Sequence, residues 1–215
     1  MDEFGRQSNF LYDGDMRADG YIQASIDNRG TPSLKGAGWR KAIYRQIGRI
    51  NIRDLAMGTK KLLERRYIDT SRIAVWGWSG GAASTLNLLF QYPAMFKTGI
   101  AIAAITNQLN YDNIYQERYM GLPQENLQDF IDGSPISHVK GLQGKLLYIH
   151  GTGDDNVHYS NAELLINELI KNNKQFEFMA YPNRSHSISE GSGTRAHLSV
   201  LYSNFLRKNC PPGAR

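Results

Sequence analysis

The chain has 215 residues and a formal net charge of +5, with 41% hydrophobic and 21% charged residues. These ordinary values exclude a largely disordered chain, and the length suits one domain with a sizeable core. The single cysteine, Cys210, excludes an internal disulfide.

The distribution of charge bears on the partners of the chain. Residues 35–72 hold eleven basic residues against three acidic ones, and Arg45, Arg49 and Arg53 recur at the spacing of one helix face. No nucleic-acid-binding motif accompanies them, so we expect a solvated face or one that meets an acidic neighbour, and no nucleic-acid partner. No apolar run approaches the length of a membrane span, and residues 1–6 lack the features of a signal peptide. We therefore expect no membrane segment in this chain.

The N-terminal part of the chain is weakly patterned. Residues 1–19 are polar and mixed, with one apolar cluster at residues 10–12, and predict an irregular segment. Residues 20–27 predict a first strand, because turn-forming residues follow them directly. Residues 39–66 are helical in character and predict a helical region that ends in a basic cluster.

Residues 73–81 have the sequence Ile-Ala-Val-Trp-Gly-Trp-Ser-Gly-Gly. The continuous apolar run predicts a strand buried on both faces, and residues 82–92 then follow helical spacing. Gly77-x-Ser79-x-Gly81 between a strand and a helix is a nucleophile-elbow pattern, in which glycines allow a tight turn that exposes the serine oxygen. A glycine turn that merely contains a serine is the alternative interpretation.

The remainder of the chain alternates strands with helices. We expect a polar excursion at residues 121–144, strands at 97–105, 145–151 and 176–182, and helices at 161–171 and 194–208. This alternation predicts one α/β domain over residues 20–209, with a doubly wound parallel sheet, and a tail at 210–215.

Tyrosines recur in the stretch before the polar excursion. Tyr111, Tyr115 and Tyr119 are four residues apart, which predicts that they line one helical face. Spacing alone leaves two uses for such a face, the hydrophobic core or a binding site.

Three of the expected strand ends carry reactive side chains. Ser79, Asp154 and His186 each follow a different strand, in that chain order. Such groups collect at the carboxyl ends of parallel strands, and the order Ser, Asp, His is that of α/β-hydrolases. We predict a triad in which the serine attacks a carbonyl carbon, the histidine moves the proton and the carboxylate orients the histidine.

Neighbouring side chains offer alternatives to this assignment. Asp155 adjoins Asp154 and is a second candidate for the carboxylate. For His150, at a strand end, we expect a structural hydrogen bond. Taken with His158, these residues match no known spacing of metal ligands, so we expect no metal and no cofactor.

Four stretches form a sequence pattern that is more specific to one family than Gly-x-Ser-x-Gly alone. They are residues 27–30 (Asp-Asn-Arg-Gly), 74–79 (Ala-Val-Trp-Gly-Trp-Ser), 115–121 (Tyr-Gln-Glu-Arg-Tyr-Met-Gly) and 150–158 (His-Gly-Thr-Gly-Asp-Asp-Asn-Val-His). In this order, across residues 20–209, they resemble the catalytic domain of the prolyl oligopeptidase family, specifically its dipeptidyl peptidase IV branch. The resemblance implies an α/β-hydrolase fold without its N-terminal strands. It also implies a serine exopeptidase that removes X-Pro or X-Ala dipeptides from peptide N-termini through an acyl-enzyme.

The resemblance also assigns roles to positions of this chain. It makes Ser79 the nucleophile, Asp154 rather than Asp155 the orienting acid, and His186 the base. It implies a proline pocket formed by Tyr111, Tyr115, Ile105 and Val157, and a contact from Asn156 to a substrate carbonyl. Beside this, the main-chain N–H of Gly80 is a candidate donor to the oxyanion.

The chain departs from the family pattern in three respects. Gly80 stands where the family usually has tyrosine, and Gln108 where the branch often has tryptophan. The chain also starts after the loop that supplies the family's oxyanion tyrosine, and lacks the β-propeller whose acidic residues hold the substrate amine. We therefore expect a piece of a longer, extracytoplasmic enzyme that acts on peptides, with weak activity or none by itself. A general esterase and a catalytically silent interaction domain stay as alternative functions. A homodimer through the C-terminal helix is left open.

Overall fold

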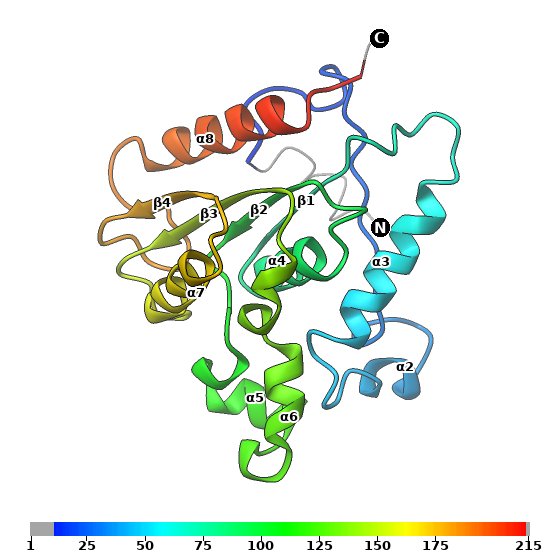
Figure 1. Cartoon of the computed structure of the whole chain (residues 1–215), viewed down its shortest axis with the longest axis vertical. Coiled ribbons are helices and arrows are strands. Elements are labelled where there is room, and N and C mark those ends of the chain that lie inside the picture. The colour runs from blue at the N-terminus through cyan, green and yellow to red at the C-terminus, as the bar shows by residue number, and fades with distance from the viewer. Residues whose placement is uncertain (1–10, 214–215) are drawn as a thin grey trace.

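The computed structural model describes residues 11–213, in which four parallel strands form one sheet with the order β1-β2-β3-β4. The strands are β1 (Ala74–Trp78), β2 (Thr98–Ile102), β3 (Lys145–Gly151) and β4 (Glu177–Tyr181). Figure 1 shows the helices around them: α2 (Ala37–Lys41), α3 (Ile50–Leu62), α4 (Gly80–Gln91), α5 (Asn113–Met120), α6 (Pro123–Gly133), α7 (Ser160–Lys171) and α8 (Thr194–Asn209). Two 3-10 helices also occur, η1 (Gln108–Asn110) and η2 (Pro135–Gly141).

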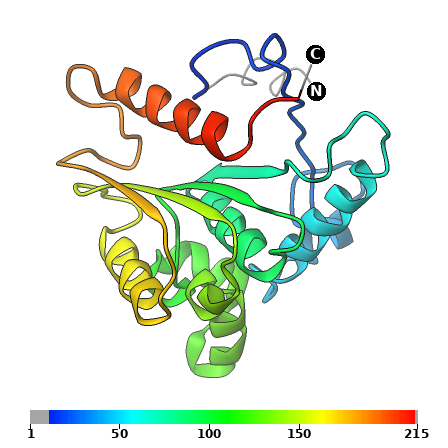
Figure 2. The same ribbon diagram turned by 45° about the horizontal axis from the view of Figure 1, so that its top comes forward.

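Both faces of the sheet are covered, as parallel strands with apolar sequences require. Helices α3, α4 and α7 pack on one face, in a core that includes Leu86, Tyr148 and Leu165. Helix α8 and the segment from residue 11 cover the other face, in a core that includes Ile149 and Phe205. Figure 2 shows α8, in red, on the opposite side of the sheet from the cyan, green and yellow helices. The predicted α/β class with a two-sided parallel sheet is confirmed.

The register brings the carboxyl ends of the strands to one edge. Trp78 of β1 lies beside Ile102 of β2, Ile102 beside Ile149 of β3, and Gly151 of β3 beside Tyr181 of β4. All positions in β2, and all but the first in β3, are buried, which explains their continuous apolar sequences. The loops that carry reactive residues therefore start from neighbouring points.

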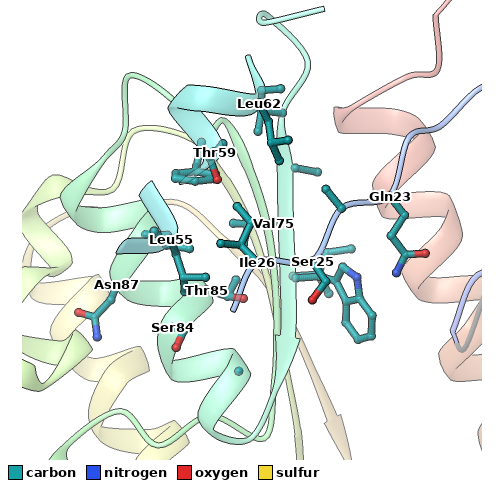
Figure 3. Close-up of a pocket in the computed structure, with 18 of the residues that line it drawn as sticks. Gln23, Ser25, Ile26, Leu55, Thr59, Leu62, Val75, Ser84, Thr85 and Asn87 are labelled. Atoms are coloured by element: carbon teal, nitrogen blue, oxygen red, sulfur yellow. The ribbon is translucent and has the colours of Figure 1, made fainter. Parts of the chain in front are cut away.

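The predicted strand at residues 20–27 is wrong, because this segment has no regular secondary structure. β1 is the edge of the described sheet, and the segment and β1 both line a cavity of about 1100 Å³. Figure 3 shows Ile26 of the segment, Val75 of β1 and Leu55 of α3 around this cavity. The segment therefore lies near β1 without forming the hydrogen-bonded ladder that defines a strand.

The helical region predicted at residues 39–66 consists of two helices, α2 and α3, joined by an irregular link. In that link Arg45 and Gly48 have positive φ angles of 59° and 79°, which interrupt a right-handed helix. Glycine is needed at position 48, because a Cβ there would lie 2.0 Å from the main-chain oxygen of Gly133 in α6. The chain turns at this point so that the link can approach α6.

The prediction that Arg45, Arg49 and Arg53 share one helix face is also wrong. Arg45 lies in the link before α3, and Arg49 is the residue that precedes the helix. Both pair with Asp129 of α6, with N–O distances of 2.6 and 3.2 Å. These two arginines therefore meet an acidic neighbour.

The polar excursion predicted at residues 121–144 contains regular structure, helix α6 followed by η2. Pro123 and Pro135 lie in the first turns of these two elements. Proline is accepted there because its missing N–H would have had no helical partner. The prolines begin helices instead of marking a loop.

Both ends of the described chain are packed against the body of the domain. Leu11, Tyr12 and Met16 are buried, although residues 11–19 have no helix or strand, and residues 1–10 of the predicted irregular segment lie outside the described residues. In the predicted tail Cys210 is buried, and Arg72 donates to the carbonyl oxygen of Pro212 at 2.8 Å. Residues 214–215 lie outside the described part.

Candidate active site

Ser79 lies at the turn between β1 and α4. Its φ of 57° and ψ of −122° fall outside the regions that residues with a side chain normally adopt, as is typical of a nucleophile elbow. Its N–H donates to the carbonyl of Ile102 at 2.9 Å, and its own carbonyl accepts from Ala83 at 3.0 Å. A Cβ on Gly77 would lie 2.3 Å from the main chain of Gly81, so only glycine allows the strand and helix to approach this closely.

Asp154 and His186 lie together beyond the ends of β3 and β4. His186 Nδ1 is 2.8 Å from Asp154 Oδ2. The Asp154 side chain is completely buried, whereas Asp155 is exposed and, within residues 11–213, makes no hydrogen bond to the histidine. The geometry therefore pairs His186 with Asp154.

The loops after β3 and β4 are joined largely through their main chains. Gly153 donates from its N–H to the carbonyl of Arg184 at 3.1 Å, and the N–H of Asn183 donates to Thr152 Oγ1 at 2.8 Å. A Cβ on Gly151 would lie 2.3 Å from the carbonyl oxygen of Arg184. These contacts fix the position of the aspartate loop relative to the histidine loop.

Four donors surround the Asp154 carboxylate. Oδ1 accepts from the main-chain N–H groups of Asn156 and Val157 at 3.0 and 2.8 Å, and Oδ2 faces His186 Nδ1 and His150 Nε2 at 2.8 and 3.1 Å. Burial acts to raise the pKa of Asp154, but the hydrogen bonds from His150, His186 and the Asn156 amide outweigh it and hold the pKa well below its ordinary value. Asp154 is therefore a buried anion at neutral pH with a fixed orientation.

Ser79 lies at the same edge of the sheet as this pair but is not joined to it. Among the residues that the structure describes, no hydrogen bond is formed by the Ser79 hydroxyl. The adjacent Trp78 donates from its indole Nε1 to the main-chain carbonyl of His186 at 2.9 Å, so the end of β1 contacts the histidine loop. The hydrogen bond between nucleophile and base is often long without substrate and shortens in the reacting complex.

The five residues predicted to bind substrate form one connected group. Ile105 and Val157 are buried in a small apolar cluster at the first turn of α4, and Tyr111 packs against it. The Tyr111 hydroxyl donates to Asn156 Oδ1 at 3.0 Å, and its ring centroid lies 5.4 Å from that of Tyr115. The structure thus gathers these side chains next to the turn that holds the serine.

The predicted helical stripe of tyrosines requires correction. Asp112 caps α5 by accepting a hydrogen bond from the N–H of Tyr115 at 3.2 Å, so Tyr111 precedes the helix. Tyr115 and Tyr119 are in the helix, with ring centroids 4.7 Å apart. The three rings still form a continuous series, because Tyr111 folds back onto Tyr115 from an extended segment.

Two hollows border the turn that holds Ser79, since Trp78 lines one of them and Gly80 lines the other. The smaller, of about 780 Å³, includes among its lining residues Trp78, Tyr111, Asn156 and His186. The larger is the cavity beside β1, which is also lined by Gly80, Ile105 and Tyr115. A Cβ on Gly80 would meet nothing within 4 Å, so the wall is open at this position. The N–H of Gly80 begins α4 and has no acceptor within the helix.

Two further residues of this site were not predicted to have a role in it. Trp78 holds the main chain of His186, and Tyr148 places its hydroxyl 3.1 Å from His150 Nδ1. Its position next to Ser79 was the feature of the sequence that could have identified Trp78. The signal for Tyr148 was alternation along a strand, which puts residues 148 and 150 on the same face.

Within residues 11–213, no group of three or more His, Cys, Asp or Glu side chains is arranged to hold a metal ion. Over the same residues, no helix is both long enough and apolar enough to cross a bilayer.

The chain is similar to known proteins over most of its length. A model of the prolyl oligopeptidase family matches residues 14–210. Venom dipeptidyl peptidase 4 of Vespa velutina is 41% identical over 190 residues, which are 86% of this chain and 24% of that protein. Prolyl endopeptidase FAP of Mus musculus is 35% identical over 194 residues, which are 88% of this chain and 25% of that protein.

Solved structures agree with this similarity. The crystal structure of Porphyromonas gingivalis dipeptidyl peptidase 4 matches with a TM-score of 0.82 and 37% sequence identity, over 85% of this chain and 26% of that one. The chain thus spans about a quarter of the length of the relatives that it matches. Its sheet and helices form an α/β-hydrolase fold. Because the family model covers nearly all of its residues, the chain belongs to the prolyl oligopeptidase family.

Proposed function

We propose that this chain is the hydrolase domain of a serine exopeptidase that removes X-Pro or X-Ala dipeptides from peptide N-termini. The observation that carries the proposal is the 2.8 Å contact between His186 Nδ1 and Asp154 Oδ2 at the sheet edge where Ser79 occupies a strained turn. The names of the relatives, dipeptidyl peptidase 4 among them, support the class of substrate.

The proposed reaction proceeds through an acyl-enzyme. Ser79 Oγ forms a bond to the scissile carbonyl carbon while His186 Nε2 takes its proton, and the π electron pair moves to the carbonyl oxygen. The Gly80 N–H donates to this oxyanion, as main-chain donors at a helix start do in related sites. The C–N bond then breaks, and His186 gives the proton to the leaving amine. Water repeats both steps, while Asp154 stays ionised and stabilises the imidazolium.

The substrate pocket in this proposal is the group around Tyr111. The apolar side chains of Ile105 and Val157 and the rings of Tyr111 and Tyr115 would enclose a proline ring, which presents a compact apolar surface. Asn156 Oδ1 already accepts from Tyr111, which leaves the amide nitrogen to donate to a substrate carbonyl.

We propose that the substrate's free amine is recognised by a part of the whole protein that lies outside this chain. The chain covers about a quarter of its relatives, and the family resemblance assigns amine recognition to a β-propeller. We accordingly expect this chain alone to react with small electrophiles faster than it cleaves peptides. An extracytoplasmic location is part of the same proposal, supported by the venom relatives.

A fluorophosphonate probe tests the mechanism, because it reacts only with an activated serine. We expect labelling of the wild-type chain at a single site, and none of Ser79→Ala. A matched control is Ser84→Ala, on the same helix, which removes a hydroxyl that donates to the Gly80 carbonyl. Absence of labelling in the wild-type chain and in any longer protein that contains it would refute the mechanism.

Two substrates separate the peptidase from its alternatives. The proposal expects the whole protein to prefer Ala-Pro-p-nitroanilide, whereas a general esterase would prefer p-nitrophenyl acetate. The open wall at Gly80 favours broader access and makes this comparison necessary. If Ser79→Ala changed neither the rate of hydrolysis nor the labelling, a catalytically silent interaction domain would replace both the peptidase and the esterase.

A further inference from the structure

His150 is a completely buried histidine that the mechanism above does not use. Its Nε2 lies 2.9 Å from the carbonyl oxygen of Val157 and 3.1 Å from Asp154 Oδ2. Its Nδ1 lies 3.1 Å from the hydroxyl of Tyr148, which is also buried. The ring therefore connects a tyrosine in β3 to the carboxylate that binds His186.

These partners determine where the hydrogens lie. The Val157 carbonyl and the ionised Asp154 carboxylate only accept, so His150 Nε2 must carry a hydrogen. Burial raises the pKa of Tyr148 well above its ordinary value, so its hydroxyl keeps its hydrogen and donates to Nδ1. The result is a directed chain from Tyr148 to His150, whose one Nε2 hydrogen is shared between the Val157 carbonyl at 2.9 Å and Asp154 Oδ2 at 3.1 Å.

We propose that His150, oriented by Tyr148, is a positioning residue that holds Asp154 Oδ2 in the place where it receives the Nδ1 hydrogen of His186. The proposal rests on the proposed function, since it concerns the same triad. His150 touches no substrate and acts through the carboxylate.

The position of Oδ2 needs such support. Asp154 Oδ1 is held by two main-chain amides of its own loop, but apart from His150 the partner of Oδ2 is His186, on a different loop. The His186 side chain is 21% exposed, whereas those of His150 and Asp154 are completely buried. His150 therefore gives Oδ2 a donor fixed in a strand when substrate or water moves the catalytic ring. A hydrogen bond to a buried charge is also costly to lose.

The groups that influence Asp154 come from several elements. His150 is the first hydrogen-bond partner that holds its pKa down, ahead of His186. Tyr148 in β3 and Tyr111 before α5 interact electrostatically with Asp154, and the Tyr159 ring, at the start of α7, packs against His150 with centroids 5.7 Å apart. Burial is the main cause of the raised pKa of each of these tyrosines. Because these tyrosines keep their hydroxyl hydrogens at neutral pH, the Tyr148 hydroxyl stays a donor to His150 there.

Two substitutions at His150 separate positioning from packing. His150→Phe keeps the shape of the ring and removes the donor, whereas His150→Gln places an amide N–H near the position of Nε2. We expect the rate of fluorophosphonate labelling to fall about 10²-fold in His150→Phe, the loss typical of a misplaced catalytic group. His150→Gln should recover most of that loss. If packing alone mattered, the phenylalanine variant would be the more active of the two.

A matched control comes from a second tyrosine–histidine pair. Tyr181 and His197 are 2.8 Å apart and do not touch Asp154. His197→Phe should label at the wild-type rate. A comparable loss in this variant would mean that labelling reports general damage to the fold, and would overturn the proposal.

Spectroscopy tests the positioning without any substrate. In the wild-type chain the ¹³C carboxyl signal of Asp154 should show no protonation of the carboxylate down to pH 3, and the Nδ1 hydrogen of His186 should resonate far downfield. In His150→Phe the carboxyl pKa should rise, so that protonation of the carboxylate becomes visible at the acid end of the same titration, and the downfield signal should broaden or disappear. An unchanged titration would overturn the proposal.

The outcomes separate this inference from the proposed function. No labelling of the wild-type chain or of the protein that contains it removes the function, whereas equal labelling of wild type and His150→Phe removes only the positioning role. If His150→Phe does not fold, ¹⁵N spectra of the wild-type chain decide the matter. A His150 Nε2 without a hydrogen would overturn the proposal, and a protonated Nε2 coupled to Asp154 would support it.

Discussion

Ser79 is half-buried and has a main-chain conformation that only glycine adopts easily. A residue with a side chain in such a region costs about 1–3 kcal/mol, and the surrounding contacts must compensate for this cost. The N–H of Ser79 is held by Ile102 in the neighbouring strand, and its carbonyl by Ala83 in α4. The turn therefore stores main-chain strain at the proposed nucleophile.

Replacing Ser79 should reveal that strain. We expect Ser79→Gly to raise the free energy of unfolding by about 1 kcal/mol, because glycine relieves the positive φ. Ser79→Ala keeps the Cβ and should show no such gain. Both variants should be inactive, so urea unfolding distinguishes them; equal stability of the two would show that the turn is unstrained.

Asp154 should make stability depend on pH. Its pKa is lower in the folded chain than the usual value of about 3.9 in the unfolded chain, so its stabilising contribution is complete above that value and is lost as the pH falls below it. The difference in free energy of unfolding between wild type and Asp154→Asn should therefore be larger at pH 7 than at pH 3. Asp155→Asn, at an exposed position, serves as the control. Urea unfolding at both pH values measures this, and a difference independent of pH would contradict the assignment.

At the scale of elements, the site depends on how closely β1 and α4 approach. Gly77 leaves no room for a Cβ beside the main chain of Gly81, while Gly80 faces open space. Gly77→Ala should lower the free energy of unfolding by about 3 kcal/mol, at the upper end of the cost of overpacking. Gly80→Ala should be neutral or slightly stabilising, since alanine favours a helix over glycine. Thermal unfolding compares them, and a tolerated Gly77→Ala would show that strand and helix can separate.

The four strands could be predicted from the sequence because each is a compact apolar run between turn signals. The helices α4, α7 and α8 were found at nearly the same residues for a similar reason, since their apolar residues recur at helical spacing. These patterns reflect burial on the sheet, which is the dominant local constraint. The predicted triad followed from them, because parallel strands place their carboxyl ends together.

Other elements depend on contacts that local patterns do not contain. Residues 20–27 have the composition of a strand, but a strand also needs a ladder, and here the segment and β1 line a cavity. The break before α3 arises where Gly48 meets Gly133, a contact between distant parts of the chain. The choice between Asp154 and Asp155 likewise depended on the loop that buries one and exposes the other.

Over the whole molecule, order should be greatest at the centre of the sheet. β2 and β3 pair on both sides, whereas within the described structure residues 22–27 make no main-chain hydrogen bonds through their N–H groups. We expect hydrogen exchange to be slowest in β2 and β3 and fast in residues 22–27. Exchange measured by mass spectrometry tests this, and equal protection of residues 22–27 and β2 would mean that the segment is paired.

The joined loops after β3 and β4 have a consequence for how the chain tolerates change. Because Asp154 and His186 are aligned through main-chain contacts, we expect residues that bear no functional group to be as constrained as the proposed triad itself. A saturation mutagenesis screen for hydrolysis should therefore score Gly151 nearly as intolerant as Asp154. The results of such a screen, taken alone, would therefore suggest more catalytic residues than the active site contains.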